Sequence, residues 1–239
     1  MTVVDKDSSR VREMFGSIAS RYDLLNHLLS LNIDRYWRRR LVKEINGLDR
    51  LIAILDVCTG TGDLAMELSR KGAVVGVDFC HPMLVIAKSK VRNRNLVDRV
   101  KFAEGDALSL PFGKESFDAV TVAFGVRNLQ ELDRGLREFL RVLRPGGFLA
   151  ILEFSKPVVP LLRDLFEFYF DHILPVIGRI VSGTAGPYRY LPDSVREFPD
   201  QQSLCCILRG NGFQDVRFTN LTIGIAALHT ARKPVLWKD

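Results

Sequence analysis

A short glycine-rich turn is the clearest place in the sequence where exposed backbone groups meet chemically useful side chains. An apolar run over residues 51–57 leads into Cys58-Thr59-Gly60-Thr61-Gly62-Asp63, and helix-forming residues follow to about position 70. A strand, a tight glycine turn and a helix expose backbone N–H groups at the helix start, where a polar or anionic ligand binds. Gly60 and Gly62 lack side chains that would block such a ligand, so we expect both to line a nucleotide site.

Acidic residues follow or precede the neighbouring strands. A second apolar run, residues 73–77, ends at Asp78, whose carboxylate can accept two hydrogen bonds from a ribose diol. Asp56 lies in the strand before the glycines, where we expect it to hold the turn and to face the amino group of a methionine moiety. Asp106 and Ala107 follow a third short run, residues 100–103, and can meet an adenine amino group.

The glycine pattern leaves more than one cofactor open. Gly60 and Gly62 with Ala65 also satisfy the G-x-G-x-x-A pattern, so a nicotinamide-dependent dehydrogenase is an alternative. A phosphate-binding P-loop is excluded because no Gly-Lys-Ser/Thr follows. The positions of Asp56 and Asp106, together with a chain end that forms a hairpin instead of a second nucleotide-binding half, favour S-adenosylmethionine. The sequence shows no metal-ligand cluster, and we expect no metal.

The elements that position these residues alternate between strand and helix. Such alternation predicts right-handed crossovers and a parallel sheet covered on both faces. The last two strand-like runs are separated by little more than a turn and predict an antiparallel hairpin. We therefore expect an α/β fold with a Rossmann-like, doubly wound, seven-stranded and mostly parallel sheet. The expected strands are residues 51–57, 73–77, 100–103, 117–123, 148–154, 213–221 and 224–232.

Two segments outside this alternation differ in character. Residues 8–45 read as an amphipathic helical extension, with apolar residues spaced three and four apart. Residues 160–181 are rich in large apolar side chains, which indicates a core helix or, alternatively, a greasy groove or a face that touches a membrane. A polar, aromatic loop is expected over residues 182–199. We expect one domain over residues 1–239, with an inserted acceptor-side region at about 156–199.

Composition narrows the class of protein. No run approaches the roughly 18 apolar residues of a membrane span, the N-terminus resembles no signal peptide, and the four cysteines form no CxxC pair. We therefore expect a cytoplasmic protein. A net charge of +6 and a basic segment at 35–43 raise the alternative of an RNA methyltransferase. The segment at 123–125 is Ala-Phe-Gly rather than Asn/Asp-Pro-Pro-Tyr, so no nucleic-acid partner is expected; the oligomeric state is left open.

Several segments together resemble a known family. Those at 56–63, 76–78, 105–107 and 143–147 look like the class I S-adenosylmethionine-dependent methyltransferases. The stretch from Tyr22 to Ser30, running on to Trp37-Arg38, resembles the N-terminal signature of the menaquinone and ubiquinone C-methyltransferases. Residues 141–155 resemble their second signature. The phrase at 124–128 and the loop at 188–199 also look like this family, and the resemblance covers nearly the whole chain.

The resemblance implies cofactor contacts, and at Ala123 and Asp34 this chain departs from the residues that are usual in the family. It places Thr59, Asp78, Asp106 and Ala107 against S-adenosylmethionine. Ala123 stands where family members often carry a serine, so a side-chain hydrogen bond to the cofactor is lost there while a backbone contact can persist. Asp34 stands where a histidine is usual, which argues against a catalytic role at that position.

The reaction implied is methylation of a ring carbon on a membrane-borne prenyl quinol, with demethylmenaquinol as the expected acceptor and a 2-methoxy-6-polyprenyl-1,4-benzoquinol as the alternative. We expect Arg127 to stabilise the phenolate, with a structural ion pair as the alternative, and Asn128 to orient the ring. Contacts to the acceptor are expected from the N-terminal helix and from the aromatic loop, with capping or packing as the alternative. These candidates are Tyr22, Asp23, Asn26, Tyr188 and Tyr190. Because the prenyl tail resides in the bilayer, we expect peripheral membrane contact.

Overall fold

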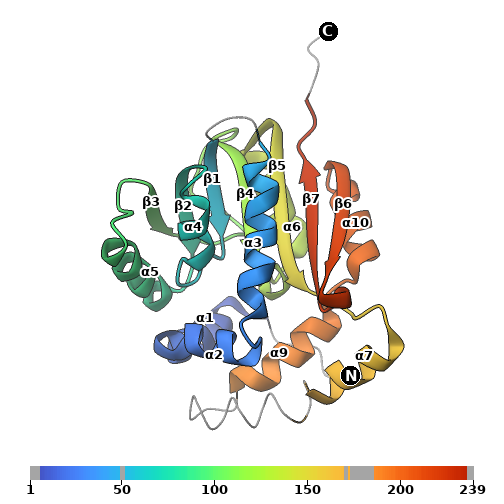
Figure 1. Cartoon of the computed structure of the whole chain (residues 1–239). Coiled ribbons are helices and arrows are strands. Elements are labelled where there is room, and N and C mark those ends of the chain that lie inside the picture. The colour runs from blue at the N-terminus through green and yellow to red at the C-terminus, as the bar shows by residue number, and fades with distance from the viewer. Residues whose placement is uncertain (1–5, 49–51, 170–171, 173–185, 236–239) are drawn as a thin grey trace.

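Helices precede the sheet in the chain and fold over one end of it. The computed structural model describes residues 6–48, 52–169, 172 and 186–235, and Figure 1 shows the whole chain. Leu31 and Asn32 adopt positive φ angles of 51° and 61°, which end one helix and start the next. The continuous helical stretch expected over residues 8–45 is therefore divided into α1 (Ser8–Ile18), the 3-10 helix η1 (Ala19–Arg21), α2 (Tyr22–Leu29) and α3 (Ile33–Asn46).

Seven strands form one sheet in the order β3-β2-β1-β4-β5-β7-β6. Neighbours from β3 to β5 pair in parallel, whereas β7 runs antiparallel to both β5 and β6. The predicted doubly wound sheet with its C-terminal hairpin is confirmed. The chain leaves the sheet centre in opposite directions from β1 and β4, which is where ligands bind in such folds. The strands are β1 (Ile52–Val57), β2 (Gly72–Asp78), β3 (Val100–Glu104), β4 (Phe117–Ala123), β5 (Leu143–Phe154), β6 (Gln214–Leu221) and β7 (Ala226–Arg232).

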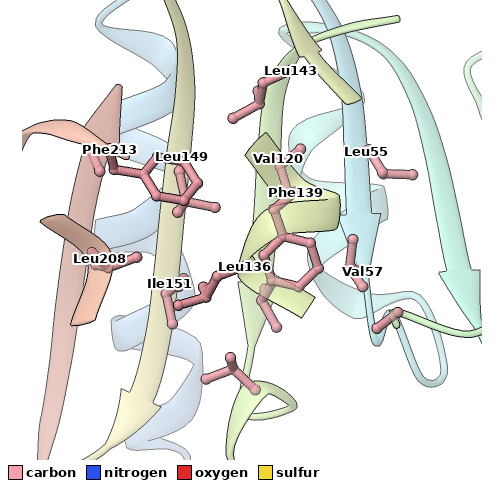
Figure 2. Packing of buried hydrophobic residues seen from close by; sticks show 14 of the residues in the cluster. Leu55, Val57, Val120, Leu136, Phe139, Leu143, Leu149, Ile151, Leu208 and Phe213 are labelled. Carbon is pink, nitrogen blue, oxygen red and sulfur yellow. The ribbon is translucent and has the colours of Figure 1, made fainter. Parts of the chain in front are cut away.

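Side chains alternate between the two faces of the sheet along each strand, and each face is buried in a core of its own. Leu55 and Val57 belong to one core together with Phe139 of α6 (Leu132–Val142) and residues of α10 (Gln201–Gly210). Figure 2 shows α6 and its Phe139 over this face of β1 and β4. Ile54, one position along, belongs to the opposite core with Leu41 of α3 and residues of α4 (Asp63–Leu68).

Strand β5 begins earlier than expected. Leu143 pairs with Phe117 and Phe148 pairs with Ala119, so residues 144–147 lie opposite the single residue Asp118 of β4. The turn residues expected there form an irregularity inside the strand pairing rather than a connection before it. Arg144 Nη1 contacts Asp118 Oδ2 at 2.7 Å and holds this irregularity against β4.

The expectation of a loop over residues 182–199 is wrong for its described part. Residues Gly186–Glu197 form helix α9, although Pro192 lies inside it. Pro187 suits a first helical turn, where a backbone N–H would have no partner. Ser194 is completely buried and Val195 is buried, so packing outweighs the helix hydrogen bond that Pro192 removes.

One end of the sheet is covered by helices from distant parts of the chain. Figure 1 shows α1, α2 and α9 gathered below the ends of β1 and β4, with α7 (Pro160–Phe168) beside them. Helix α5 (His81–Asn93) follows β2 at the same end. Among the described helices, none combines the length and apolar character needed to cross a bilayer. This covered end is where the functional side chains meet.

Candidate active site

The glycine turn is held from below by a buried carboxylate. Asp56 is 1% exposed and accepts hydrogen bonds from the Thr59 hydroxyl at 2.6 Å and from the Thr121 hydroxyl at 2.8 Å. Burial raises the pKa of Asp56 to about 6, because few charged partners offset the loss of water around it. Asp56 therefore holds the start of the glycine turn through Thr59, as the sequence predicts. Through Thr121 it also joins the turn to the neighbouring strand β4.

Asp78 holds the same turn from the side. The Gly60 N–H donates to its Oδ2 at 2.8 Å, and the Cys80 N–H donates to its Oδ1 at 2.9 Å. Burial raises the pKa of this carboxyl as well. Each carboxylate oxygen has a second lone pair, so Asp78 can still accept from a ligand while it positions the turn. The end of β2 thus lies against the glycine turn, as predicted.

The two glycines of the turn have different tasks. Gly60 adopts φ +55°, and a Cβ built there would meet only the Tyr22 ring at 3.9 Å. Gly62 adopts φ +79°, and its Cβ would lie 2.8 Å from Cζ of Phe102, inside the protein. Gly62 therefore permits close packing of the turn against β3. Gly62 lines neither of the two cavities described below, so its expected contact with a ligand stays a prediction.

A cavity of about 800 Å³ lies over the ends of β1, β2 and β4. The predicted cofactor residues that line it are Gly60, Asp78, Asp106, Ala107 and Ala123. Asp106 also accepts a hydrogen bond from the Leu108 N–H at 2.9 Å, which fixes its carboxylate beside the cavity. We call this space the larger cavity.

A second cavity, of about 490 Å³, adjoins the first across the glycine turn. Asp56 and Thr59 line this smaller cavity, together with Arg38 and His27 from the N-terminal helices. The two cavities have five lining residues in common, so they adjoin across the turn at Gly60. The shared residues are Tyr22, Cys58, Gly60, Ala123 and Phe124.

Ionic contacts tie helix α2 to the glycine turn. Asp23 accepts a hydrogen bond from the Thr61 hydroxyl at 2.5 Å and forms an ion pair with Lys90 of α5 at 2.8 Å. Lys90 also contacts Asp63 at the start of α4. Asp23 was expected to contact the acceptor. It lines the smaller cavity, but its carboxylate is engaged by Thr61 and Lys90.

A second group of contacts joins α2 to α3. His27 Nδ1 lies 2.8 Å from Asp34 Oδ2, and Arg38 Nη2 lies 2.8 Å from the same oxygen. Asp34 is 4% exposed, and this contact explains how an aspartate is accommodated there. Groups of His, Cys, Asp and Glu suitable for a metal ion are absent from the residues that the structure describes.

Tyr22 and Asn26 face the two cavities from α2. Tyr22 lines both cavities and Asn26 lines the smaller one. Burial raises the pKa of Tyr22, although a hydrogen bond with Asn26 and the positive charge of Arg127 oppose that rise. Tyr22 therefore stays a neutral phenol above the junction of the two cavities.

Arg127 has the structural environment that the sequence left as the alternative. Its Nη1 lies 2.8 Å from Glu153 Oε1, and the two side chains are 6% and 1% exposed. The same nitrogen donates to the Phe124 carbonyl, and the guanidinium lies 5.6 Å from the Phe154 ring centroid. Arg127 lines neither cavity. It holds the 3-10 helix η2 (Val126–Asn128) onto β5 through this buried ion pair.

Asn128 and Tyr190 meet at the wall of the larger cavity. The Tyr190 hydroxyl donates to Asn128 Oδ1 at 3.0 Å, although 62 positions separate the two residues. Asn128 lines the cavity, so two residues expected at the acceptor lie together in the structure, and their contact with an acceptor stays a prediction. Tyr188 is placed in helix α9, but its side chain lies outside the described part of the chain.

Sequence reasoning missed the contribution of helix α1 and of the residues after β2. Lys6, Val11 and Phe15 line the larger cavity from the N-terminal segment, and Phe79 and Met83 line it from the start of α5. The amphipathic spacing of residues 8–45 indicated a buried apolar face. Nothing in that spacing says which cavity the face covers.

Comparisons with known proteins agree across the chain. The profile of the ubiE/COQ5 methyltransferase family matches residues 1–233. The chain is 48% identical over 226 residues to a demethylmenaquinone methyltransferase of Deinococcus radiodurans, covering 93% of this chain and 92% of that protein. It is 44% identical over 237 residues to a ubiquinone/menaquinone biosynthesis C-methyltransferase UbiE of Geobacter sp. (strain M21), covering 98% and 100%.

Solved structures share the fold at lower identity. A SAM-dependent methyltransferase from Aquifex aeolicus has a TM-score of 0.60 at 22% identity, covering 83% of this chain and 89% of that one. A SAM-dependent methyltransferase from Thermotoga maritima has a TM-score of 0.63 at 18% identity, covering 92% and 98%. At such identities the likeness concerns the arrangement of sheet and helices.

Proposed function

Because the chain belongs to the ubiE/COQ5 methyltransferase family and uses S-adenosylmethionine as its methyl donor, we propose that it methylates a ring carbon of a prenylated quinol. The favoured acceptor is demethylmenaquinol, since the relative with 48% identity is a demethylmenaquinone methyltransferase. The alternative acceptor is a 2-methoxy-6-polyprenyl-1,4-benzoquinol.

The observation that carries this proposal is the pair of adjoining cavities on either side of the turn at Gly60. On one side Asp78 and Asp106 offer acceptors for the ribose and adenine of the donor. On the other side Asp56 lies buried, and no ion pair engages it among the described residues, so the ammonium of the methionine end would supply the missing charge. Arg38 and His27 line that smaller cavity and would face the methionine carboxylate. When bound, S-adenosylmethionine supplies an electrophilic methyl group on its sulfonium.

The protein's own residues would align the acceptor and exclude water. Tyr22 and Phe124 line the junction of the cavities with aromatic surface, suited to stacking on a planar quinol ring. Asn128, held by Tyr190, would orient a ring hydroxyl. Arg127 would act as a positioning residue that fixes η2, since its charge is paired with Glu153. Alignment of this kind can supply a large part of the rate enhancement.

A methyl-transfer assay tests the proposal. The purified protein would receive methyl-labelled S-adenosylmethionine with demethylmenaquinol and, in a parallel reaction, the methoxy-benzoquinol, both kept reduced. Label is expected in the naphthoquinol. The oxidised quinones serve as the control and should accept none, because they carry no hydroxyl whose ionisation makes the ring carbon nucleophilic. Absence of label in both quinols would contradict the proposed function.

Access to a prenyl substrate suggests a membrane-facing surface. Val158 and Ile223 are 57% and 51% exposed and adjoin, since the Val158 N–H donates to the Ile223 carbonyl at 3.1 Å. Val159 and Phe168 of the same region are also exposed, at 41% and 53%. We propose that this apolar patch touches the inner face of the cytoplasmic membrane. Co-sedimentation with anionic liposomes at low salt tests this, and loss of binding in Val158→Ser with Ile223→Ser is expected.

A further inference from the structure

Methylation of a quinol ring carbon needs a group that favours loss of a hydroxyl proton. A phenol has a pKa of about 10, so at neutral pH the nucleophilic phenolate is scarce unless a cation lies beside the oxygen. The inference below rests on the proposed function, because it assigns the residue that meets this need. The candidate must be a cation on the wall of the larger cavity, at its Asn128 end.

Arg127 does not satisfy this requirement. Its guanidinium is buried against Glu153 at 2.8 Å and also donates to the Phe124 carbonyl, so its charge is neutralised. It does not line either cavity. An anionic oxygen in the larger cavity would therefore make no direct contact with this ion pair.

Lys6 is the basic residue among those described that line the larger cavity. Its side chain is half-buried, and within the described residues no hydrogen bond or ion pair engages its ammonium. The other lining residues that carry a charge at neutral pH are Asp78 and Asp106. These two carboxylates lie at the strand ends that we assign to the nucleoside, which leaves Lys6 for the acceptor.

Lys6 lines the same cavity as Asn128, and three charged side chains act on its amine. Glu197 of α9, Arg127 of η2 and Glu153 of β5 are the charged groups that act on it. Burial lowers the pKa of Lys6 most, Glu197 raises it, Arg127 lowers it, and Glu153 raises it. Glu197 belongs to α9, which carries Tyr190, and Arg127 belongs to η2, which carries Asn128, whereas Glu153 belongs to β5. Because Lys6 and Asn128 both line the larger cavity, their side chains face the same space.

The N-terminal segment is held in position by a helix cap. Asp7, which follows Lys6, accepts hydrogen bonds from the Ser9 N–H at 2.9 Å and the Arg10 N–H at 3.4 Å at the start of α1. One turn later Val11 is 2% exposed, which anchors α1 beside the larger cavity that it helps to line. The cap and the anchor fix the backbone at Lys6, while its flexible side chain can follow a bound oxygen.

We propose that Lys6 is a catalytic residue whose ammonium donates a hydrogen bond to the ionised hydroxyl of the acceptor. The hydroxyl O–H bond breaks, its electron pair stays on oxygen, and the proton passes to water. The ring carbon then forms its bond to the methyl carbon as the methyl–sulfur bond breaks, with that electron pair remaining on sulfur. The ring C–H gives up its proton while the oxygen regains one, so one proton is released in total.

A redox-stable probe tests the electrostatic role without turnover. 4-Methoxy-1-naphthol carries one ionisable hydroxyl, and its ionisation can be followed by absorbance in a complex with protein and adenosylhomocysteine. In the wild-type complex the bound probe should ionise at least one pH unit below the free probe. Lys6→Met should abolish that shift, and Lys6→Arg should retain most of it. A shift of unchanged size in Lys6→Met overturns the proposal.

Controls separate this role from folding and from cofactor binding. Lys88→Met removes an exposed lysine of α5 and should leave the probe's ionisation as in the wild type. Affinity for adenosylhomocysteine, measured by calorimetry, should stay within twofold in Lys6→Met; a tenfold loss would assign Lys6 to the cofactor and overturn the proposal. A probe that binds neither wild type nor variants would instead refute the quinol site itself.

Turnover should show the same dependence. We expect kcat of Lys6→Met to fall on the order of a hundredfold at neutral pH, within the usual range for proton-transfer assistance. The loss should stay constant below the pKa of the hydroxyl bound to the wild type, because both rates then rise in parallel with pH. Above that pKa it should shrink about tenfold for each pH unit, because the acceptor is already ionised in the wild type while the variant still gains phenolate. A loss that persists undiminished once the hydroxyl is ionised in both proteins would point to a merely structural role and overturn the proposal.

Discussion

The two walls of the larger cavity are built in different ways. The wall at the strand ends is made by Asp78 and the turn at Gly60, whose backbone N–H donates to Asp78, while Asp56 holds the turn from the smaller cavity through the Thr59 hydroxyl. The opposite wall brings together residues far apart in sequence. There Lys6 lies beside η2, and Asn128 meets Tyr190 across 62 positions.

This difference separates the tasks of the two walls. The first wall presents fixed backbone geometry, which suits a donor molecule that is the same in every turnover. The second wall presents side chains from α1 and η2, with α9 joined to η2 through Tyr190, and its shape depends on how these helices pack over the sheet. We expect substitutions in the first wall to alter donor binding, whereas substitutions in the second should alter stability or acceptor chemistry.

The largest effect is expected at the ion pair behind the acceptor wall. Arg127→Met leaves Glu153 buried without its partner and should cost about 3–5 kcal/mol of unfolding free energy. Urea denaturation measures this cost. Arg134→Met, which removes the exposed pair with Glu131, is the matched control and should cost less than about 1 kcal/mol.

A compensating variant sharpens that result. Replacing both partners, as in Arg127→Met with Glu153→Leu, should recover much of the stability because no unpaired charge remains buried. Stability equal to wild type in Arg127→Met alone would show that the pair does not hold η2, and Arg127 would return as a candidate for direct contact with the acceptor.

An intermediate effect should divide the two glycines of the turn. Alanine at a left-handed position costs about 1–2 kcal/mol, and the clash of the Gly62 Cβ with Phe102 adds about 1–3 kcal/mol. The main effect of Gly62→Ala should therefore be a lower free energy of unfolding. Gly60→Ala lacks that clash but enters both cavities, so it should lower the affinity for adenosylhomocysteine about tenfold. Equal loss of affinity in both variants would contradict this division.

The smallest effect is a pH dependence of donor binding. The pKa of Asp56 is about 6, so the carboxyl becomes neutral below that pH and attracts the donor's ammonium less. Calorimetric affinity for adenosylhomocysteine should fall up to about tenfold between pH 7 and pH 5. Thr121→Val removes a hydroxyl donor to Asp56 and should move the midpoint to higher pH. An affinity that stays constant from pH 5 to 8 would refute this assignment.

The same carboxyl has the opposite influence on the stability of the free protein. Its folded-state pKa of about 6 lies above the ordinary value of 3.8, so the folded state binds the proton more tightly than the unfolded chain. The resulting stabilisation is fully present below pH 3.8 and is lost as the pH rises through about 6. Denaturation with and without adenosylhomocysteine would separate this term from ligand binding.

The positions of the residues that we assign to the methyl donor follow from the local sequence pattern. Residues 51–57 and 73–77 are apolar runs of strand length, and Asp78 ends the second one. Carboxyl ends of parallel strands meet at one sheet edge, so the placement of Asp78 beside the glycine turn was predictable. The separate task of Gly62 was not predictable, because the Phe102 ring that it accommodates belongs to another strand.

The helical cover was less accessible to such reasoning. The breaks at η1 and at Leu31 divide one periodic segment into three α-helices, although its apolar spacing continues across them. Helix α9 forms despite Pro192, because burial of Ser194 and Val195 outweighs the weak local preference. A propensity for helix or loop is a small energy that tertiary packing overrides.

The sequence by itself determined the sheet, its antiparallel C-terminal hairpin and the acidic strand ends around Gly60, since these depend on short-range periodicity and on the geometry of parallel strands. Only the tertiary structure decided that Arg127 pairs with Glu153, that Asn128 meets Tyr190 and that Lys6 lines the larger cavity. Those contacts join segments far apart in the chain, and they form because burying the apolar faces of α1 and α9 brings the helices over the sheet end, a collective packing energy that no local pattern encodes.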